Sequence, residues 1–208
     1  MSIEKAYNSW AEQYDSNNNR TRDLDAHATI SVLSRYDFRS VLELGCGTGK
    51  NTGWLLENAH EVIGLDFSGE MLNKAKEKIN SPRVQFEKAD LKKPWNVEDA
   101  SADLVTSSLT LEHIEDLDHI FDQARSKLKS NGLFFICELH PFKQYLGSKA
   151  KFETEKGTQE LETYTHNISE YVKAAEACDF KMLELKEWFD EDSEKEIPRL
   201  ISFVFDVG

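Results

Sequence analysis

Short runs rich in aliphatic and β-branched residues alternate along most of the chain with longer stretches in which apolar residues recur at helical spacing. The expected strands are Ser40–Leu44, Glu61–Asp66, Val84–Ala89, Ala102–Ser107 and Leu133–Leu139. Amphipathic helices are expected around Asn51–Asn58, Gly69–Ile79 and Leu117–Lys129, with Asn131-Gly132 ending the last of them. Strands that alternate with helices pair in parallel through right-handed crossovers. The pattern therefore predicts an α/β fold with a doubly wound, mostly parallel sheet.

The last third of the chain departs from this alternation. Residues 141–166 are polar and show no strong period, so no element is predicted there. A helix is expected over Ile168–Cys178, with Ser169 as the capping residue near its start. Two β-like runs follow, Lys181–Phe189 and Leu200–Val207, separated by an acidic turn. Because no helix lies between these two strands, they are expected to pair antiparallel, which completes a seven-stranded sheet with a C-terminal hairpin.

Composition and charge limit the classes of partner and the cellular compartment that are expected for this chain. Hydrophobic residues make up 39% of the chain, with twelve Phe and four Trp, which is enough for a packed core. The 25 Lys and Arg against 38 Asp and Glu give a net charge of −13, and such a surface repels the phosphates of nucleic acids. The longest apolar run, Leu133–Cys137, is too short to span a bilayer, and the first residues lack the apolar stretch of a signal peptide. Three widely spaced cysteines are typical of reduced thiols. A soluble, cytoplasmic protein with no nucleic-acid or membrane partner is expected, and no oligomeric state is predicted.

Three glycines at alternate positions follow the first expected strand, in the segment Val41–Lys50. Glycines in such a turn let a ligand approach the backbone, and the helix that follows offers free N–H groups. A dinucleotide fingerprint needs a sixth-position glycine that is missing in both registers, and a P-loop fails because Asn51 follows Gly49-Lys50. Glu43, two residues before Gly45, suits a cationic ligand better than a phosphate.

The segment Val41-Leu42-Glu43-Leu44-Gly45-Cys46-Gly47-Thr48-Gly49 resembles motif I of the class I S-adenosylmethionine-dependent methyltransferases. Asp66 ends the next strand 21 positions after Gly45, where a carboxylate can accept both ribose hydroxyls. Ala89-Asp90-Leu91 resembles the site that reads the adenine amino group, and the stretch through Leu111-Glu112-His113-Ile114 looks like motif IV of the small-molecule, ubiquinone/menaquinone-methyltransferase-like branch. The resemblance implies a Rossmann-like fold and S-adenosyl-L-methionine as the cofactor, with S-adenosyl-L-homocysteine as its product. The cofactor-binding residues that it implies are Tyr14, Glu43, Gly45, Cys46, Gly47, Gly49, Asp66, Phe67, Met71, Asp90, Leu91 and Ser107.

Some of these residues also have structural readings. Asp66 and Asp90 could cap helices or turns, Met71 could belong to the core, and Ser107 is expected to contribute its backbone more than its hydroxyl. The segment Tyr7–Asp15 resembles the family's N-terminal "Y-x-x-W-A-x-x-Y-D", in which the second aromatic residue, here Tyr14, closes the cofactor pocket. An aromatic helix packed on the sheet is the alternative.

The whole chain, residues 1–208, is expected to form one methyltransferase domain. Residues 1–39 would be a helical lid segment, with the polar stretch 16–22 at its rim, and 40–139 the cofactor-binding core. Residues 140–167 would form an acceptor-site insert, where loops at the carboxyl edge set specificity, and 168–208 the last helix and the hairpin.

Two histidines are the candidates for catalysis, because histidine is the usual general base near neutral pH. His140 directly follows the strand Leu133–Leu139 and is expected to face the methyl donor, with Glu138 holding its second ring nitrogen. His113 is the second candidate, although a histidine there can also only buttress the loop. Glu112, Glu138 and His140 match no ligand spacing for a metal, so none is expected.

The predicted function is therefore in-line methyl transfer from S-adenosylmethionine to an O, N or C nucleophile of a small molecule. The alternatives are a non-catalytic S-adenosylmethionine-binding protein and a methyltransferase that acts on a protein side chain. A DNA amino-methyltransferase would carry an Asn/Asp-Pro-Pro-aromatic motif where Ser107-Ser108-Leu109-Thr110 stands, and the failed fingerprint disfavours a nicotinamide-dependent oxidoreductase.

Overall fold

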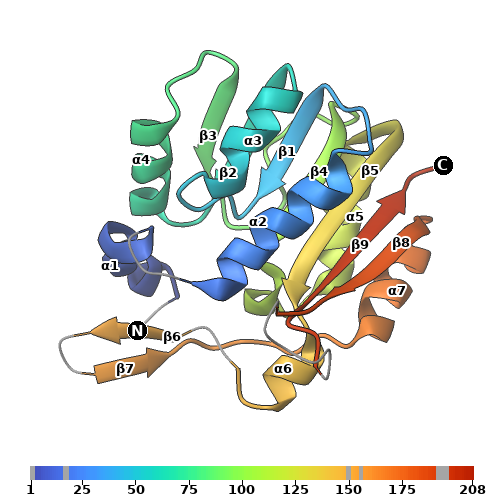
Figure 1. Cartoon of the computed structure of the whole chain (residues 1–208). Helices are drawn as coiled ribbons and strands as arrows, with labels where there is room; N and C mark the ends of the chain where they lie inside the picture. Colours follow the sequence, from blue (N-terminus) through green and yellow to red (C-terminus); the bar gives the residue numbers. More distant parts are fainter. Residues whose placement is uncertain (1–2, 16–18, 149–150, 155–156, 191–196) are drawn as a thin grey trace.

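The computed structural model describes residues 3–15, 19–148, 151–154, 157–190 and 197–208. Its main sheet consists of β1 (Ser40–Leu44), β2 (Glu61–Asp66), β3 (Val84–Lys88), β4 (Ala102–Ser108), β5 (Leu128–Leu139), β8 (Lys181–Trp188) and β9 (Leu200–Asp206). The strand order is β3-β2-β1-β4-β5-β9-β8, in which the first five strands pair in parallel and β9 is antiparallel to both of its neighbours (Figure 1). The predicted α/β fold with a seven-stranded, mostly parallel sheet and a terminal hairpin is confirmed.

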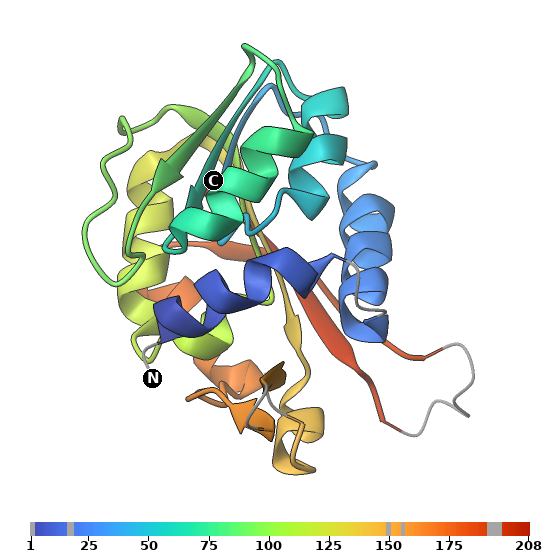
Figure 2. The ribbon, with the colours of Figure 1, turned by 90° about the vertical axis from the view of Figure 1, so that its left-hand side faces the viewer.

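Helices cover both faces of this sheet. The helices are α1 (Ile3–Tyr14), α2 (Arg20–Leu33), α3 (Lys50–Asn58), α4 (Gly69–Lys78), α5 (Leu117–Lys127), α6 (Pro141–Tyr145) and α7 (Ile168–Ala177), with a 3₁₀ turn η1 (Leu111–His113). In Figure 2, α2, α3 and α4 lie on one face of the sheet and α5 and α7 on the other. Helix α1 covers neither face and crosses the edge at which the parallel strands end. That arrangement leaves the carboxyl ends of the strands as the place for a ligand.

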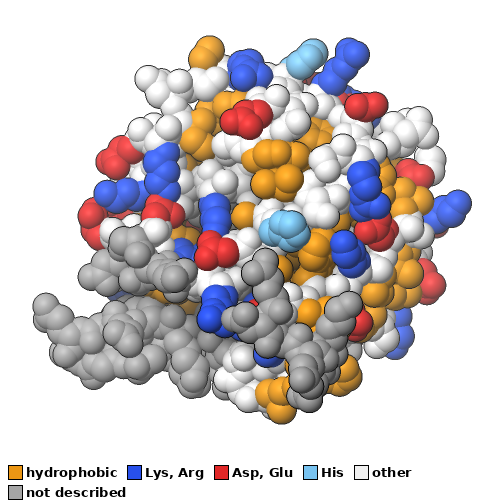
Figure 3. Space-filling view, viewed as in Figure 1, with side chains coloured by type: hydrophobic (Ala, Val, Ile, Leu, Met, Phe, Trp, Pro, Cys, Tyr) orange, Lys and Arg blue, Asp and Glu red, His pale blue; other side chains and the backbone are white. Residues whose placement is uncertain are grey.

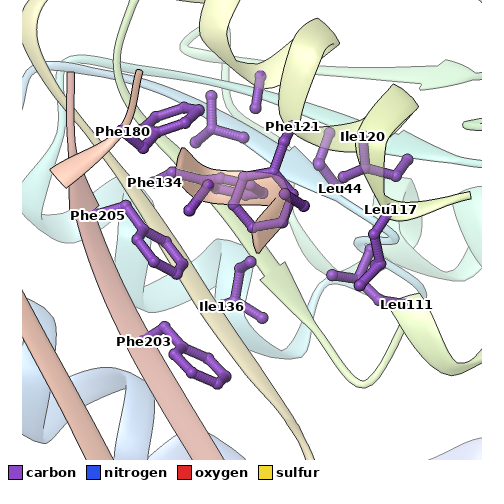
Figure 4. Packing of buried hydrophobic residues seen from close by; sticks show 14 of the residues in the cluster. Leu44, Leu111, Leu117, Ile120, Phe121, Phe134, Ile136, Phe180, Phe203 and Phe205 are labelled. Carbon is purple, nitrogen blue, oxygen red and sulfur yellow. The ribbon is translucent and has the colours of Figure 1, made fainter. Parts of the chain in front are cut away.

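The core beneath α5 and α7 is aromatic. Apolar side chains of α5 recur at helical spacing, and its Phe121 is fully buried. The Phe121 ring lies 5.2 Å from Phe134 of β5, 5.4 Å from Phe205 of β9 and 5.8 Å from Phe180 (Figure 4). Removing such a ring costs roughly 3–5 kcal/mol because the cavity only partly collapses. This cluster fixes β5 against the terminal hairpin, so the strand end at Leu139 has a defined place.

Several boundaries differ from the sequence prediction. Strand β5 starts at Leu128, directly after α5, so Asn131-Gly132 lies inside the strand instead of ending the helix. The reason is that Leu128 already pairs with Ala102, and the left-handed Asn131 (φ 61°) belongs to an irregular register at the start of β5. Helix α7 is capped by Asn167, which forms a capping box with Glu170, and not by Ser169.

The insert that showed no period is structured. It contains α6 and a separate hairpin of β6 (Lys151–Thr154) and β7 (Gly157–Glu160). The predicted acidic turn at 191–196 and the first part of the predicted lid rim, 16–18, lie outside the described residues.

The surface carries charges of both signs. Over the face in Figure 3, the described Lys and Arg side chains are interspersed with Asp and Glu and do not gather into one patch. Among the described residues, no helix combines the length and apolar character that a membrane span requires.

Candidate functional site

A cavity of about 780 Å³ opens at the carboxyl ends of the parallel strands, beneath α1. Of the residues predicted for the site, nine line it: Tyr14, Gly45, Gly47, Asp66, Phe67, Met71, Asp90, Leu91 and His113. Glu43 and Cys46 line a small adjoining cavity of about 60 Å³, which shares Tyr14, Gly45 and Gly47 with the first. Gly49, Ser107 and His140 line neither of these two cavities. Most of the residues singled out from the sequence are thus brought together by the fold.

The glycine loop needs its glycines for two reasons. Gly45 and Gly47 have φ values of +66° and +54°, a region that favours glycine. A Cβ atom on Gly45 would lie 2.1 Å from Oγ1 of Thr110, so the turn after β4 packs directly on the loop. Gly49 is also left-handed and serves as the N-cap of α3, which explains its absence from the cavity wall. The loop is therefore shaped by its neighbours before any ligand arrives.

Asp66 at the end of β2 fastens this loop. Its carboxylate accepts the N–H of Gly47 at 2.9 Å and the N–H of Ser68 at 2.8 Å. Burial raises the pKa of Asp66 to about 6, although these backbone N–H groups pull it down. Each carboxylate oxygen can accept a second hydrogen bond, and Asp66 lines the cavity, so hydroxyl donors of a ligand could satisfy it. Asp66 thus both shapes the loop and offers an acceptor to a ligand.

Acidic and basic side chains both line the small cavity. Glu43 is buried and accepts the hydroxyl hydrogen of Thr52, and burial raises the pKa of Glu43 to about 8. Asp25 of α2 is also buried and accepts a hydrogen bond from Asn51 at 3.0 Å. The guanidinium of Arg22 lies 4.1 Å above the Tyr14 ring and lines the same space. Carboxyl groups beside a guanidinium complement a group that is itself both cationic and anionic.

Helix α1 is tied across the mouth of the large cavity by polar contacts. The hydroxyl of Ser68 donates to Oδ1 of Asn8 at 2.7 Å, and Lys88 pairs with Glu4 at 2.7 Å. Lys78 pairs with Asp15 at the other end of the helix. All of these partners lie on α4, on its capping residue or at the end of β3, so α1 rests on the same elements that form the cavity wall.

One catalytically capable pair lies inside the cavity. The hydroxyl of Tyr7 on α1 is 2.8 Å from Nε2 of His113, and Nδ1 of His113 is 3.3 Å from the carbonyl oxygen of Glu162. Because a carbonyl can only accept, Nδ1 carries the hydrogen, and Nε2 accepts the Tyr7 hydroxyl. Burial lowers the pKa of His113, so its imidazole is neutral near pH 7. A neutral Nε2 atom beside a hydroxyl can receive a proton.

His140 does not join this pair, and the predicted orientation is wrong. Its side chain is fully buried, with Nε2 3.2 Å from the Glu187 carboxylate and Nδ1 accepting the N–H of Phe142. Glu138 does not hold it either, because the Glu138 carboxyl accepts the N–H groups of Thr110 and Leu111. His140 caps α6, whose first residue is Pro141, and its ring lines neither of the two cavities.

Other residues of the site carried no recognisable signal. Tyr7, Trp10 and Tyr14 share one face of α1 at spacings of three and four, and Tyr7 is also the first residue of the N-terminal segment that resembles the family, but neither signal pairs it with His113. Arg22, Thr110 and Glu162 reach the two cavities from α2, from the turn after β4 and from the insert, respectively. Among the described residues, no three His, Cys, Asp or Glu side chains group as metal ligands would.

Comparisons with known proteins point in one direction. A family model described as "Methyltransferase domain" matches residues 42–136. An uncharacterized methyltransferase of Emericella nidulans is 27% identical over an alignment of 219 positions, gaps included, that spans 87% of this chain and 76% of that protein. Phosphoethanolamine N-methyltransferase 1 of Arabidopsis thaliana is 35% identical over 127 residues, but these are 57% of this chain and only 26% of that enzyme. Among solved structures, the DhpI–SAH complex has a TM-score of 0.76 at 22% identity and is matched over 97% of this chain and 93% of that one. In sequence this chain is thus similar to methyltransferases, and it shares its fold with a solved structure.

Proposed function

We propose that this chain, which belongs to the class I S-adenosylmethionine-dependent methyltransferases, methylates an O, N or C nucleophile of a small molecule. The observation that carries the proposal is the Tyr7–His113 pair, which lines the cavity formed by the glycine loop and Asp66. When bound, S-adenosylmethionine supplies a methyl group on a sulfonium whose departure leaves a neutral thioether. What the chain must add is alignment of the acceptor and, for a hydroxyl or ammonium, a place for the proton.

The residues present fit the cofactor. The hydroxyls of Thr29 and Thr106 are buried, find no partner among the described residues and line the small cavity. Buried polar atoms of this kind indicate a ligand or water that completes them. The amino acid part of the cofactor would lie there, with its carboxylate near Arg22 and its ammonium near Glu43. An ammonium beside Glu43 would favour the ionised carboxylate and offset the effect of burial.

The nucleoside part fits the large cavity. Asp66 would accept the ribose hydroxyls, and Asp90 would accept the adenine amino group. Phe67, Met71 and Leu91 add apolar side chains to the lining of the same cavity. With Tyr14 lining both cavities, α1 would close over the bound molecule and exclude water from it.

The Tyr7–His113 pair would handle the acceptor. The Tyr7 hydroxyl donates to Nε2 of His113, so its oxygen is free to accept a hydrogen bond from the acceptor's nucleophilic group. A proton released there can pass through Oη of Tyr7 to Nε2, which is neutral because burial lowers the pKa of His113. The cavity of about 780 Å³ favours a small acceptor over a protein side chain, which would have to reach beneath α1.

The proposal is tested in two steps. Calorimetry with S-adenosylhomocysteine and, in parallel, with NAD should show binding of the first only. A panel of small-molecule hydroxyl, amine and enol compounds is then incubated with cofactor labelled on the methyl group. Transfer to a member of the panel is expected, and it should fall in His113→Ala but not in His60→Ala, which changes an exposed histidine. Label that is found only on proteins would favour the side-chain alternative, and binding without transfer to any acceptor would favour the non-catalytic one.

A further inference from the structure

The turn between β4 and η1 carries both halves of the proposed site, and a buried carboxyl group of β5 holds it. We propose that Glu138 is a positioning residue that fixes this turn, placing Thr110 against the glycine loop and His113 against Tyr7. The inference rests on the proposed function for its consequence, but the placement itself depends only on contacts within the chain.

Three consecutive backbone N–H groups of the turn are bound by the end of β5. Leu109 donates to the carbonyl oxygen of Cys137 at 2.9 Å. Thr110 and Leu111 both donate to Oε1 of Glu138, each at 2.9 Å. Within the described part of the chain, no other side-chain acceptor holds these two N–H groups, so the single carboxyl oxygen of Glu138 sets the direction in which η1 begins.

The backbone of the turn is strained where it is held. Leu109 has a φ of +51°, a left-handed conformation that an L-residue with a side chain adopts only at an energetic cost. Such residues persist where surrounding contacts fix them, and they gather at functional sites. Here the contacts that fix it are those made by Cys137 and Glu138. Without the Glu138 carboxyl, we expect the turn to relax toward an ordinary conformation.

Thr110, in the turn, and His113, in the 3₁₀ turn that follows it, both line the large cavity. The Thr110 side chain occupies the space in which a Cβ of Gly45 would lie, so a shift of Thr110 alters the shape of the glycine loop. His113 follows in η1, its N–H donating to the Thr110 carbonyl oxygen at 3.1 Å, and its ring meets Tyr7. One carboxyl group therefore sets the geometry on the cofactor side and on the acceptor side together.

The neutral form of Glu138 is sufficient for this role. Its Oε2 atom is buried and has no partner among the described residues, while Oε1 accepts both N–H groups. Burial and the neighbouring Glu112 raise the pKa of Glu138 to about 8. A glutamine has the same shape and keeps one acceptor oxygen, so Glu138→Gln should preserve the turn. Glu138→Leu has a similar size but no acceptor.

The experiment compares these two variants by two readouts that need no acceptor substrate. The first is the affinity for S-adenosylhomocysteine by calorimetry, and the second is the titration of the His113 ring followed by NMR of its Cε1 proton. Glu138→Gln should stay within about twofold of the native affinity and keep the native titration midpoint. Glu138→Leu should bind at least about tenfold more weakly, and its His113 midpoint should rise because the ring becomes more exposed to water.

Each outcome decides the matter. A folded Glu138→Leu chain with native affinity and a native His113 titration would overturn the proposal, as would a Glu138→Gln chain that behaves like the leucine variant. If Glu138→Leu does not fold, Glu138→Asp replaces it, since it withdraws the carboxyl by one methylene and should shift both readouts in the same direction. Glu187→Gln, on the exposed edge strand β8, is the matched control and should change neither. A native chain that does not bind S-adenosylhomocysteine would count against the proposed function, whereas the His113 titration tests Glu138 independently.

Discussion

The hydroxyl of Tyr7 lies 2.8 Å from Nε2 of His113, and this contact joins α1 to the turn after β4 across 106 positions of sequence. Both side chains line the same cavity, one from the helix that covers it and one from its floor. The helix that covers the cavity is therefore hydrogen-bonded to the residue that would receive a proton. The position of α1 and the placement of this histidine are therefore linked through one hydrogen bond.

Removing the Tyr7 hydroxyl should therefore affect stability and turnover together. In Tyr7→Phe the Nε2 atom of His113 loses its donor, and we expect a loss of roughly 0.5–1.5 kcal/mol in the free energy of unfolding, measured in urea. Methyl transfer should fall further than binding of S-adenosylhomocysteine does. Tyr145→Phe is the control, because the Tyr145 hydroxyl bonds to Asn167 at an exposed site. Equal effects of the two substitutions would show that the Tyr7–His113 contact has no special role.

Asp66 should contribute to cofactor affinity through its charge. We expect Asp66→Ala to weaken binding of S-adenosylhomocysteine by about 1.5–3 kcal/mol, the range for a hydrogen bond to a charged group. Asp66→Asn keeps the shape and one acceptor for the N–H of Gly47, so it separates the ribose contact from loop support. Calorimetry gives both values. Native affinity in the alanine variant would rule out the ribose assignment.

The glycine loop allows a matched test between two glycines. Gly45→Ala would bring a Cβ to 2.1 Å from Thr110 Oγ1 at a positive φ, so it should destabilise the chain and abolish cofactor binding. Gly53 lies in α3 with open space where its Cβ would be, and there alanine should stabilise by roughly 0.5–1 kcal/mol. Thermal unfolding and calorimetry measure both. A tolerated Gly45→Ala would mean that the turn at Thr110 yields easily.

The strand ends show most clearly which features of the site can be predicted from the sequence. Asp66 and Asp90 line one cavity, as expected from the sequence, because the order of elements alone carries the ends of parallel strands to one edge. The same reasoning failed for His140, since the ring direction depends on the cap of α6 and on Glu187, which lies 47 positions away. A strand pattern predicts where a residue lies along the sheet, but not which neighbours bind its side chain.

Residues that reach the site from other elements could not be predicted from the sequence, for a related reason. Arg22 reaches the small cavity only because α2 lies beside the glycine loop, and Glu138 acts on a turn 28 positions earlier. Neither belongs to a motif with its partners. The polar insert also looked structureless because its hairpin is too short to show a period.

Cofactor binding should order α1. The hydrophobic cluster beneath α1 is small, with Ala6 and Leu161 as its buried members. Polar contacts, among them the hydrogen bond from Ser68 to Asn8, therefore contribute much of what holds the helix in place. We expect its backbone amides to exchange hydrogen more slowly when S-adenosylhomocysteine is present, measured by mass spectrometry. Asn8→Ala should speed exchange in the free chain, and Ser9→Ala, which lies on the exposed side of α1, should not. Identical exchange with and without ligand would show that α1 is not a lid.

The buried carboxyl groups should make the ligand-free chain less stable as the pH rises. Burial raises the pKa of Glu43 and of Glu138 to about 8, whereas the pKa of a Glu in the unfolded chain is about 4.3. Between these values the folded chain holds more protons than the unfolded one. The contribution of both groups is fully present below about pH 4.3 and is lost as the pH rises through their folded values. His113, whose pKa burial lowers, acts in the opposite sense only below about pH 6.5.

We therefore expect the free energy of unfolding in urea to fall between about pH 6.5 and 8, where the histidine no longer opposes the carboxyl groups. Glu43→Gln removes one titrating group and should make the fall shallower. Saturating S-adenosylmethionine should do the same, because its ammonium would favour the ionised form of Glu43 in the folded chain. A free energy of unfolding that stays level or rises over this range would mean that Glu43 and Glu138 are already ionised in the folded chain, with compensating partners that the contacts described above do not provide.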